Sequence, residues 1–212
     1  MPEQSTTPSS RRAYRLGRRL ESVDETRRRI TAAAFELHAT VGPSRTTIRA
    51  IATRAGVQRH TVYAHFPDLE TLYVACTEHG IRVTGMPVAE PWAAISDPAT
   101  RLRHGLREVF AWYRSNEGML RNVLYDIDPT APPPTQPDQF EIRMETLFDT
   151  LAEGWTVTTP EDQPTLLAVL AHALAFETWR SLTAGGLTDE QAINLLASIV
   201  ESVATGSIAI RG

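Results

Sequence analysis

The chain has 212 residues, of which 42% are hydrophobic and 22% charged, so its composition is that of a folded protein rather than a disordered one. Its single cysteine excludes an intramolecular disulfide framework and a zinc site built from several cysteines. The first twenty residues hold no apolar core, and no apolar run reaches the roughly 20 residues that cross a bilayer. We therefore expect a cytoplasmic protein with no signal peptide and no membrane partner.

The formal net charge of −4 conceals two regions of opposite sign. Residues 1–67 carry 12 arginines against 5 acidic residues, whereas residues 68–212 carry 9 arginines against 20 acidic residues. This asymmetry indicates a basic module for a polyanion joined to an acidic body. Chance clustering of solvated charges would give the same count, so charge alone leaves both interpretations open.

Hydrophobic spacing predicts helices in the basic region. Residues 1–21 are polar and arginine-rich, and we expect them to form a flexible basic arm. Ser22 and Glu25 have capping-box spacing, which predicts that the first helix starts there and continues to Val41. Two short helices are predicted next, over residues 48–55 and about 58–64.

The acidic region predicts six further helices and no β-strand of any length. Asp68 is placed to cap the first of them, and Asp97-Pro98 is a typical helix start. Five prolines between residues 128 and 139 require a loop, because proline removes a hydrogen-bond donor and clashes inside a helix. The predicted helices lie over residues 68–76, 98–113, 119–127, 140–151, 160–183 and 189–205. The fold class is therefore all-α, with about nine helices.

A helix-turn-helix pattern lies within residues 46–66. Ala52, Gly56 and Val62 have the spacing at which such a motif needs a small contact residue, a glycine with positive φ and a β-branched anchor. The polar residues left pointing outward from the second helix are Gln58, Arg59, Thr61 and His65. Arginine pairs with guanine, glutamine with adenine, and a threonine methyl packs on thymine, so these residue types suit the major groove. The same spacing also fits a packed helical hairpin without a nucleic-acid partner.

Residues 42–72 resemble the tetracycline-repressor (TetR) family of bacterial transcriptional regulators. The shared features are Gly42, Thr46-Thr47-Ile48, Ile51-Ala52, Ala55-Gly56-Val57, Thr61-Val-Tyr-Ala-His-Phe66, Leu69 and Leu72. The resemblance implies a DNA-binding head of three helices, followed by a body that binds a small-molecule effector and dimerises. It also implies that six positions face DNA, namely Thr47, Gln58, Arg59, Thr61, Tyr63 and His65.

The start of the fourth helix departs from the family pattern. Family members usually have a lysine there that grips phosphate, whereas this chain has Asp68-Leu69-Glu70. The expected clamp on the DNA backbone is weaker, and the arginine-rich arm is a candidate to compensate. Arms of this kind reach the minor groove, for which arginine is well suited.

Several of these residues also have a purely structural interpretation. Tyr63 either contacts phosphate through its hydroxyl or is a half-buried core ring, and His65 either contacts phosphate or caps its helix. Arg49 is either a phosphate contact or a solvated charge. Arg59 has few structural duties on so short a helix, so it is the best candidate for base readout. Cys76 lies on an apolar stripe and is expected to be a core residue rather than a redox sensor.

The aromatic residues of the body are either core or the walls of a ligand pocket, since helical bundles place such cavities between helices. Our candidates for the ligand pocket are Trp112, Tyr113, Phe148, His172 and Phe176; for His172, an interior or dimer-interface position is the alternative. The helices predicted over 160–183 and 189–205 carry more apolar surface than the body needs. They predict a four-helix interface in a symmetric homodimer.

No metal-binding, phosphate-binding or nucleophile motif occurs, so we expect no enzymatic activity, no metal and no cofactor. The expected organisation is an arm (1–21), a helix-turn-helix domain (22–67) and a ligand-binding and dimerisation domain (68–212). The favoured function is a ligand-responsive repressor that binds a palindromic operator in double-stranded DNA and is released by a small-molecule effector. The alternatives are a helical small-molecule-binding protein or enzyme that never touches DNA, and an adaptor whose basic head binds an acidic protein.

Overall fold

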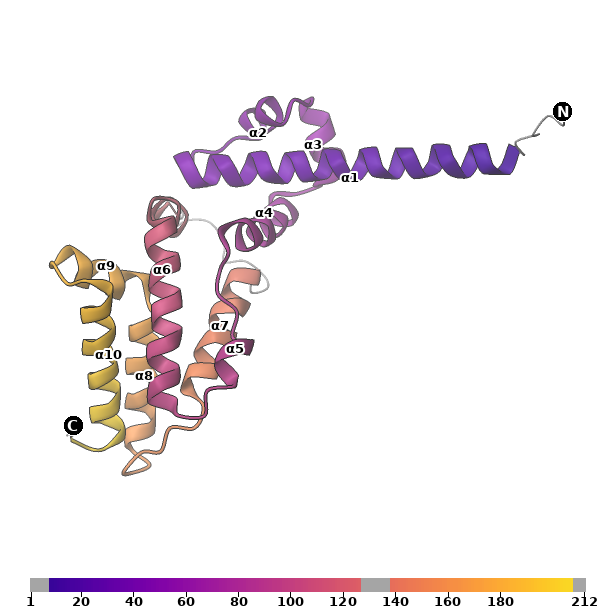
Figure 1. Cartoon of the computed structure of the whole chain (residues 1–212). Coiled ribbons are helices and arrows are strands. Elements are labelled where there is room, and N and C mark those ends of the chain that lie inside the picture. Colours follow the sequence, from indigo (N-terminus) through magenta and orange to yellow (C-terminus); the bar gives the residue numbers. More distant parts are fainter. Residues whose placement is uncertain (1–7, 127–137, 208–212) are drawn as a thin grey trace. The chain divides into compact units, whose positions relative to one another are not determined.

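The computed structural model describes residues 8–126 and 138–207, and every regular element within these ranges is an α-helix (Figure 1). The all-α prediction is confirmed, with ten helices in the described part of the chain instead of about nine. The chain divides into two compact units: a head of residues 1–80 and 121–133, and a body of residues 81–120 and 134–212. The head thus contains the predicted DNA-binding domain of residues 22–67 together with further residues, and the boundary of that domain stays a prediction.

The head is built from α1 (Pro8–Val41), α2 (Ile48–Ala55), α3 (Arg59–His65) and the first part of α4 (Leu69–Thr84). In Figure 1, α2 and α3 lie along the C-terminal half of α1, and α2 packs on both of its neighbours. Burial of an apolar face, rather than intrinsic propensity, stabilises helices as short as α2 and α3. The buried core of the head contains Ile30, Ala33, Ala34, Ile51, Ala52, Ala55, Val62, Phe66, Leu72 and Cys76.

The first helix begins earlier than the sequence predicted. Its backbone is helical from Pro8, so it passes through the expected start at Ser22 without interruption. Ser22 lies inside the helix, where its carbonyl accepts a hydrogen bond from Thr26 Oγ1 at 2.8 Å. A capping box starts a helix only where the preceding chain is not helical. Arginine, leucine and alanine upstream of Ser22 are good helix formers, so the predicted flexible arm is helical from Pro8 onward.

The body contains the end of α4, most of α6 and all of the remaining helices. Its aromatic and aliphatic core is formed largely by α6, α8 and α10, which run side by side in Figure 1. Among the described residues, none of the helices combines the length and the apolar character that crossing a membrane requires. The helices that lie wholly or mostly in the body are α5 (Glu90–Ala93), α6 (Pro98–Tyr125), α7 (Gln139–Ala152), α8 (Asp162–Leu174), α9 (Phe176–Ala184) and α10 (Asp189–Ala204).

Residues 98–125 form one helix, α6, where the sequence analysis predicted two helices separated near residues 114–118. The polar segment between them includes Ser115 and Asn116, whose side chains donate to the carbonyls of Ala111 and Trp112 at 2.9 Å each. These bonds keep the polar side chains on the helix instead of competing with it. The predicted start of this helix at Asp97-Pro98 is confirmed, and Asp97 accepts from the Thr100 backbone N–H at 2.8 Å.

The helix predicted over 160–183 is two helices, α8 and α9, which meet at Ala175. Ala175 is extended (φ −69°, ψ 134°), and its carbonyl accepts from the backbone N–H groups of Thr178 and Trp179 to start α9. The carbonyl of Leu174 accepts a hydrogen bond from the buried Tyr113 hydroxyl at 2.5 Å. A side chain 61 residues away therefore satisfies the backbone at this break, and no local signal marks it.

Capping boxes start two helices of the body. At the start of α10, the Thr188 hydroxyl oxygen accepts from the Gln191 backbone N–H at 3.2 Å, and Gln191 Oε1 accepts from the Thr188 backbone N–H at 2.9 Å. A capping box also starts α7, where Asp138 accepts from the Glu141 backbone N–H at 2.8 Å. The proline-rich loop predicted over 128–139 falls almost entirely on residues 127–137, which lie outside the described residues.

Candidate nucleic-acid interface

The turn between α2 and α3 has the local geometry that the sequence motif predicts. Thr47 is the N-cap of α2, and its hydroxyl oxygen accepts from the Ala50 backbone N–H at 3.1 Å. Gly56 is the C-cap, in the left-handed conformation with φ 66°, which a residue without a Cβ adopts at no steric cost. Val57 then donates its backbone N–H to the carbonyl of Ala52 at 2.9 Å, so the chain reverses tightly before α3.

The second helix of the motif, α3, has residues buried in the core of the head and residues exposed to solvent. Val62 is fully buried (0% exposed) and Phe66, the C-cap of α3, is 1% exposed, so this side of the helix faces the core. By contrast, Tyr63 is 49% exposed, and Arg59 and the N-cap residue Gln58 are exposed as well. The helix therefore presents a polar edge to solvent, as required of a segment that reads base pairs in the major groove.

The seven predicted DNA contacts lie on α3 and at the start of α2. The two on α2 are the exposed Thr47 and Arg49, while Thr61 and His65 on α3 are half-buried. His60, which is exposed next to Arg59 at the start of α3, is not among the predicted contacts. His60 lies two positions before the buried Val62, so a helical projection places it on the side away from Val62 and could have found it. The remaining exposed members of the predicted set are Gln58, Arg59 and Tyr63.

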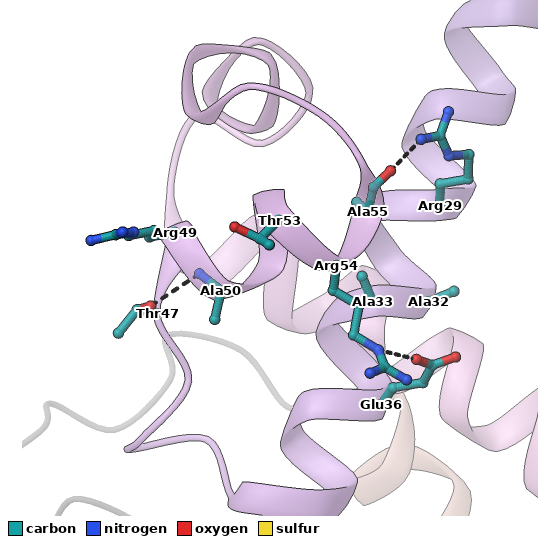
Figure 2. Close-up of a pocket in the computed structure, with 10 residues that line it drawn as sticks. All are labelled: Arg29, Ala32, Ala33, Glu36, Thr47, Arg49, Ala50, Thr53, Arg54 and Ala55. Carbon is teal, nitrogen blue, oxygen red and sulfur yellow. Dashed lines mark hydrogen bonds and ion pairs between the residues drawn. The ribbon is translucent and has the colours of Figure 1, made fainter.

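A groove of about 810 Å³ runs between α1 and α2 and is flanked by arginines (Figure 2). Arg54 forms an ion pair with Glu36 of α1, and a hydrogen bond joins Arg29 of α1 to the carbonyl of Ala55. Figure 2 shows Arg49 extending away from the Arg54–Glu36 pair, at the end of α2 where Thr47 lies. Arg49 thus carries its charge beside the α2 N-terminus, where the helix dipole also favours an anion.

The start of α4 is occupied by the chain's own carboxylate. Asp68 accepts from the backbone N–H of Thr71 at 2.7 Å and from its hydroxyl at 2.6 Å. The hydroxyl and backbone hydrogen bonds to Thr71 lower the pKa of Asp68, so this carboxylate is charged at neutral pH. The donors that a phosphate would use at this helix terminus are therefore partly engaged, and a negative charge lies among them.

The loop between α1 and α2 is held by the residue that follows α6. Asp126 accepts from Ser44 twice, at 2.6 Å from the hydroxyl and 3.0 Å from the backbone N–H. Hydrogen bonding from the Ser44 hydroxyl is the main cause that lowers the pKa of Asp126. Gly42 has φ 91°, and a Cβ there would lie 2.0 Å from Asp126 Oδ2. These contacts all belong to the head and fix the chain just before the α2 N-cap.

Cys76 is a buried residue of the head core, as the sequence predicted. Its thiol lies 3.3 Å from His38 Nδ1, and burial raises the pKa of the thiol to about 12. Burial also lowers the pKa of His38. A thiol that stays protonated and enclosed at neutral pH is a poor nucleophile and a poor redox sensor.

Three of the five residues predicted to line a ligand pocket lie together in the body. Trp112, Tyr113 and Phe176 are nearly fully buried, and the ring centroid of Tyr113 lies 5.5 Å from Trp112 and 5.3 Å from Phe176. Phe148 is half-buried on α7. His172 is exposed on α8, with its ring 3.2 Å from the Thr178 hydroxyl. A ligand-binding role for these residues stays a prediction.

Part of the head matches a known family model. Residues 30–76 match the family model for bacterial regulatory proteins of the tetR family. Among solved structures, the fold is similar to that of a protein from Syntrophomonas wolfei str. Goettingen assigned to TetR-family transcriptional regulators. The two are 20% identical, with a TM-score of 0.52 over 89% of this chain and 99% of that chain. No curated protein matches this chain.

Proposed function

We propose that this chain, whose residues 30–76 form a DNA-binding domain of the TetR family, is a ligand-responsive transcriptional regulator that reads DNA through α3. The observation that carries the proposal is the two-sided environment of α3. Val62 is fully buried, whereas Arg59 and Tyr63 on α3 and Gln58 at its N-cap are exposed. A helix held in this way enters the major groove with its base-reading side chains unobstructed.

Base readout and backbone contact fall to different residues in this proposal. Arg59 is the candidate for a bidentate contact to guanine, and Gln58 for a contact to adenine. Tyr63, Thr47 and Arg49 are exposed beside them and are candidates for phosphate contacts, which fix the register of the head on the duplex. Asp68 places a negative charge at the α4 N-terminus. In this proposal, arginines elsewhere in the head therefore bind more of the phosphates than α4 does.

The regulator acts as a homodimer in this proposal, with α8 and α10 of each protomer forming a four-helix interface. The two helices pack on one another within the body. Their exposed sides carry small or apolar residues that allow close helix approach, including Ala168 and Ala171 on α8 and Leu195 and Ser198 on α10. A two-fold dimer presents two α3 helices to half-sites about 34–36 Å apart, or a multiple of that distance, which predicts a palindromic operator.

The effector would act through the body. A small molecule that binds among the aromatic residues of α6 and α9 shifts the dimer toward a conformation that no longer fits both half-sites. The effector can shift this conformational equilibrium only to the extent that its affinities for the two conformations differ. In this proposal the protein is a repressor, and the effector releases it from its operator.

The test is selection of genomic fragments by the purified full-length protein, followed by footprinting of the enriched sequences. The expected result is protection of an inverted repeat, with salt-dependent affinity and one dimer per site. Analytical ultracentrifugation of the free protein measures the oligomeric state separately. Fragments enriched without a common sequence, or no enrichment over random duplex, would contradict the proposal. Protection of a single unrepeated site would contradict the dimer while retaining DNA binding.

A further inference from the structure

The C-terminal ends of α2 and α3 are both contacted by arginines of α1. Arg27 Nη1 donates to the carbonyl of His65, the last residue of α3, at 2.7 Å. The Arg27 guanidinium also lies over the ring of Phe66, 4.1 Å from its centroid. One side chain therefore contacts both the end of the recognition helix and the aromatic residue that anchors this end in the core.

Arg29 makes the equivalent contact at the end of α2. Its Nη2 donates to the carbonyl of Ala55 and lies 3.4 Å from that of Gly56. A Cβ at Gly56 would lie 2.9 Å from the same nitrogen, so the glycine gives the guanidinium access to the turn. Figure 2 shows Arg29 reaching from α1 to the end of α2.

Helix physics gives these contacts a strong effect on α3. The last four carbonyls of a helix lack partners within it and carry the negative end of the helix dipole, so a guanidinium there is stabilising. α3 has only 7 residues, and a helix of that length is not stable on its own. Its Gln58 N-cap makes no side-chain hydrogen bond to the helix. The orientation of α3 therefore depends on Val62, on Phe66 and on the contact from Arg27.

We infer that Arg27 is a positioning residue for base readout: it sets the orientation of α3 through the His65 carbonyl and Phe66, without itself contacting DNA. Its guanidinium is half-buried and already engaged at both of these groups. Arg29 performs the matching function for α2. This inference rests on the proposed function, because it concerns how α3 reads a sequence.

Arg28 provides a matched control within the same turn of α1. Its side chain is 70% exposed and pairs with Glu25 at 2.9 Å, one turn away on the same helix. Arg27→Ala and Arg28→Ala remove the same charge from neighbouring positions, so they alter the long-range attraction to DNA almost equally. Only Arg27→Ala removes the contact with the end of α3.

The first measurement is the affinity of the wild type and both variants for the selected operator and for a random duplex, over a range of salt concentrations. We expect Arg27→Ala to lose about tenfold in operator affinity relative to Arg28→Ala, as for loss of one charge-assisted hydrogen bond. The random-duplex affinities and the salt slopes of the two variants should agree, because binding to random duplex depends on the charge that both variants lose and not on base readout by α3. Arg27→Lys, which can still donate to the His65 carbonyl, should recover part of the loss.

The second measurement is amide hydrogen exchange in the free protein, with melting curves to confirm that each variant is folded. Arg27→Ala should speed exchange in α3 and at Phe66, whereas Arg28→Ala should leave it unchanged. Equal operator affinities for the two alanine variants, or equal exchange in α3, would overturn the positioning role. A wild-type protein that binds operator and random duplex equally would instead contradict the proposed function, and the exchange data would still report on the Arg27 contact.

Discussion

The head and the body differ in how their helices end. In the head, Thr47 caps the start of α2 and Gly56 caps its end, and both act through atoms a few residues away. In the body, α8 ends at Ala175 with neither glycine nor proline, and the Tyr113 hydroxyl satisfies the carbonyl at the break. Local caps therefore delimit α2 of the head, whereas a side chain from a distant segment contacts the break between α8 and α9 in the body.

The two regions also report separately in solution, which makes the comparison testable. All four tryptophans, at positions 92, 112, 155 and 179, belong to the body. Tryptophan fluorescence therefore follows the body alone, while far-UV circular dichroism follows both units.

Removal of a core ring from the head should have the largest effect. Phe66 is 1% exposed, and Phe66→Ala should destabilise the head by about 3–5 kcal/mol because it leaves a cavity. Denaturation followed by circular dichroism should show an early transition that tryptophan fluorescence does not share. Leu69→Ala, at a residue 69% exposed, should change the stability by less than about 0.5 kcal/mol. A fluorescence midpoint that falls as far as the dichroism midpoint would mean that the two units unfold together.

Two glycines with similar backbone angles offer a matched pair, one in each unit. Gly186 in the body has φ 97° and open space around its Cβ position, so Gly186→Ala should cost about 1–2 kcal/mol of backbone strain. Gly42 in the head has φ 91°, but a Cβ there would collide with Asp126. Gly42→Ala should therefore cost roughly twice as much, because it adds displacement of Asp126 to the strain. Equal shifts in denaturation midpoint would show that the Asp126 contacts with Ser44 contribute nothing.

Base readout should depend on the head's polar edge in a sequence-dependent way. Arg59→Ala should weaken operator binding by about 1–3 kcal/mol and relax the preference at one base pair. Arg54→Ala removes the same charge from an arginine paired with Glu36, and it should affect operator and random duplex alike. Binding measured on a panel of operators with single base-pair changes distinguishes the two. Equal losses on specific and random duplexes for Arg59→Ala would contradict its assignment.

The smallest expected effect is an acid dependence of stability in each unit. Hydrogen bonds from Ser44 lower the pKa of Asp126 in the head, and the Arg114 guanidinium is the main cause that lowers the pKa of Asp189 in the body. A lowered folded-state pKa gives stability that is present above the unfolded value, about 3.9 for aspartate, and is lost as pH falls through the folded value.

Asn substitutions test this acid dependence unit by unit. Asp126→Asn should weaken the acid dependence below about pH 4 in circular dichroism, while Asp189→Asn should do so in tryptophan fluorescence. Urea denaturation between pH 2 and pH 7 measures both. Unchanged pH profiles would contradict the role of these hydrogen bonds in stability.

The helix-turn-helix motif could be predicted from the sequence because its residues lie close together in the chain. Ala52, Gly56 and Val62 each have a role that follows from residue size, from φ or from β-branching, and the structure places each as expected. His60 was missed although its position, two residues before the buried Val62, places it on the outward side of α3. Arg27 was missed because nothing local distinguishes it from Arg28, and only the fold brings it to the end of α3.

The boundaries of the body helices were harder to predict, most of all in α8. Residues 166–176 are apolar nearly all round, so the spacing gave no sign of the break at Ala175. The polar residues near 115 predicted a break in α6 that the structure lacks, because their side chains bond back to the helix. The boundaries of these helices depend on which partner satisfies each backbone group, and such partners come from other helices.

The amino-acid sequence by itself determined the all-helical class, the helix-turn-helix and its polar edge, because caps, turn glycines and anchors act over a few residues. Tertiary structure alone decided which arginine of residues 27–29 holds the end of α3 and where α8 gives way to α9. It also decided that Asp126 holds the loop before α2. These features depend on charges and hydrogen-bonding groups from distant segments, and the chain brings those groups together only when it folds.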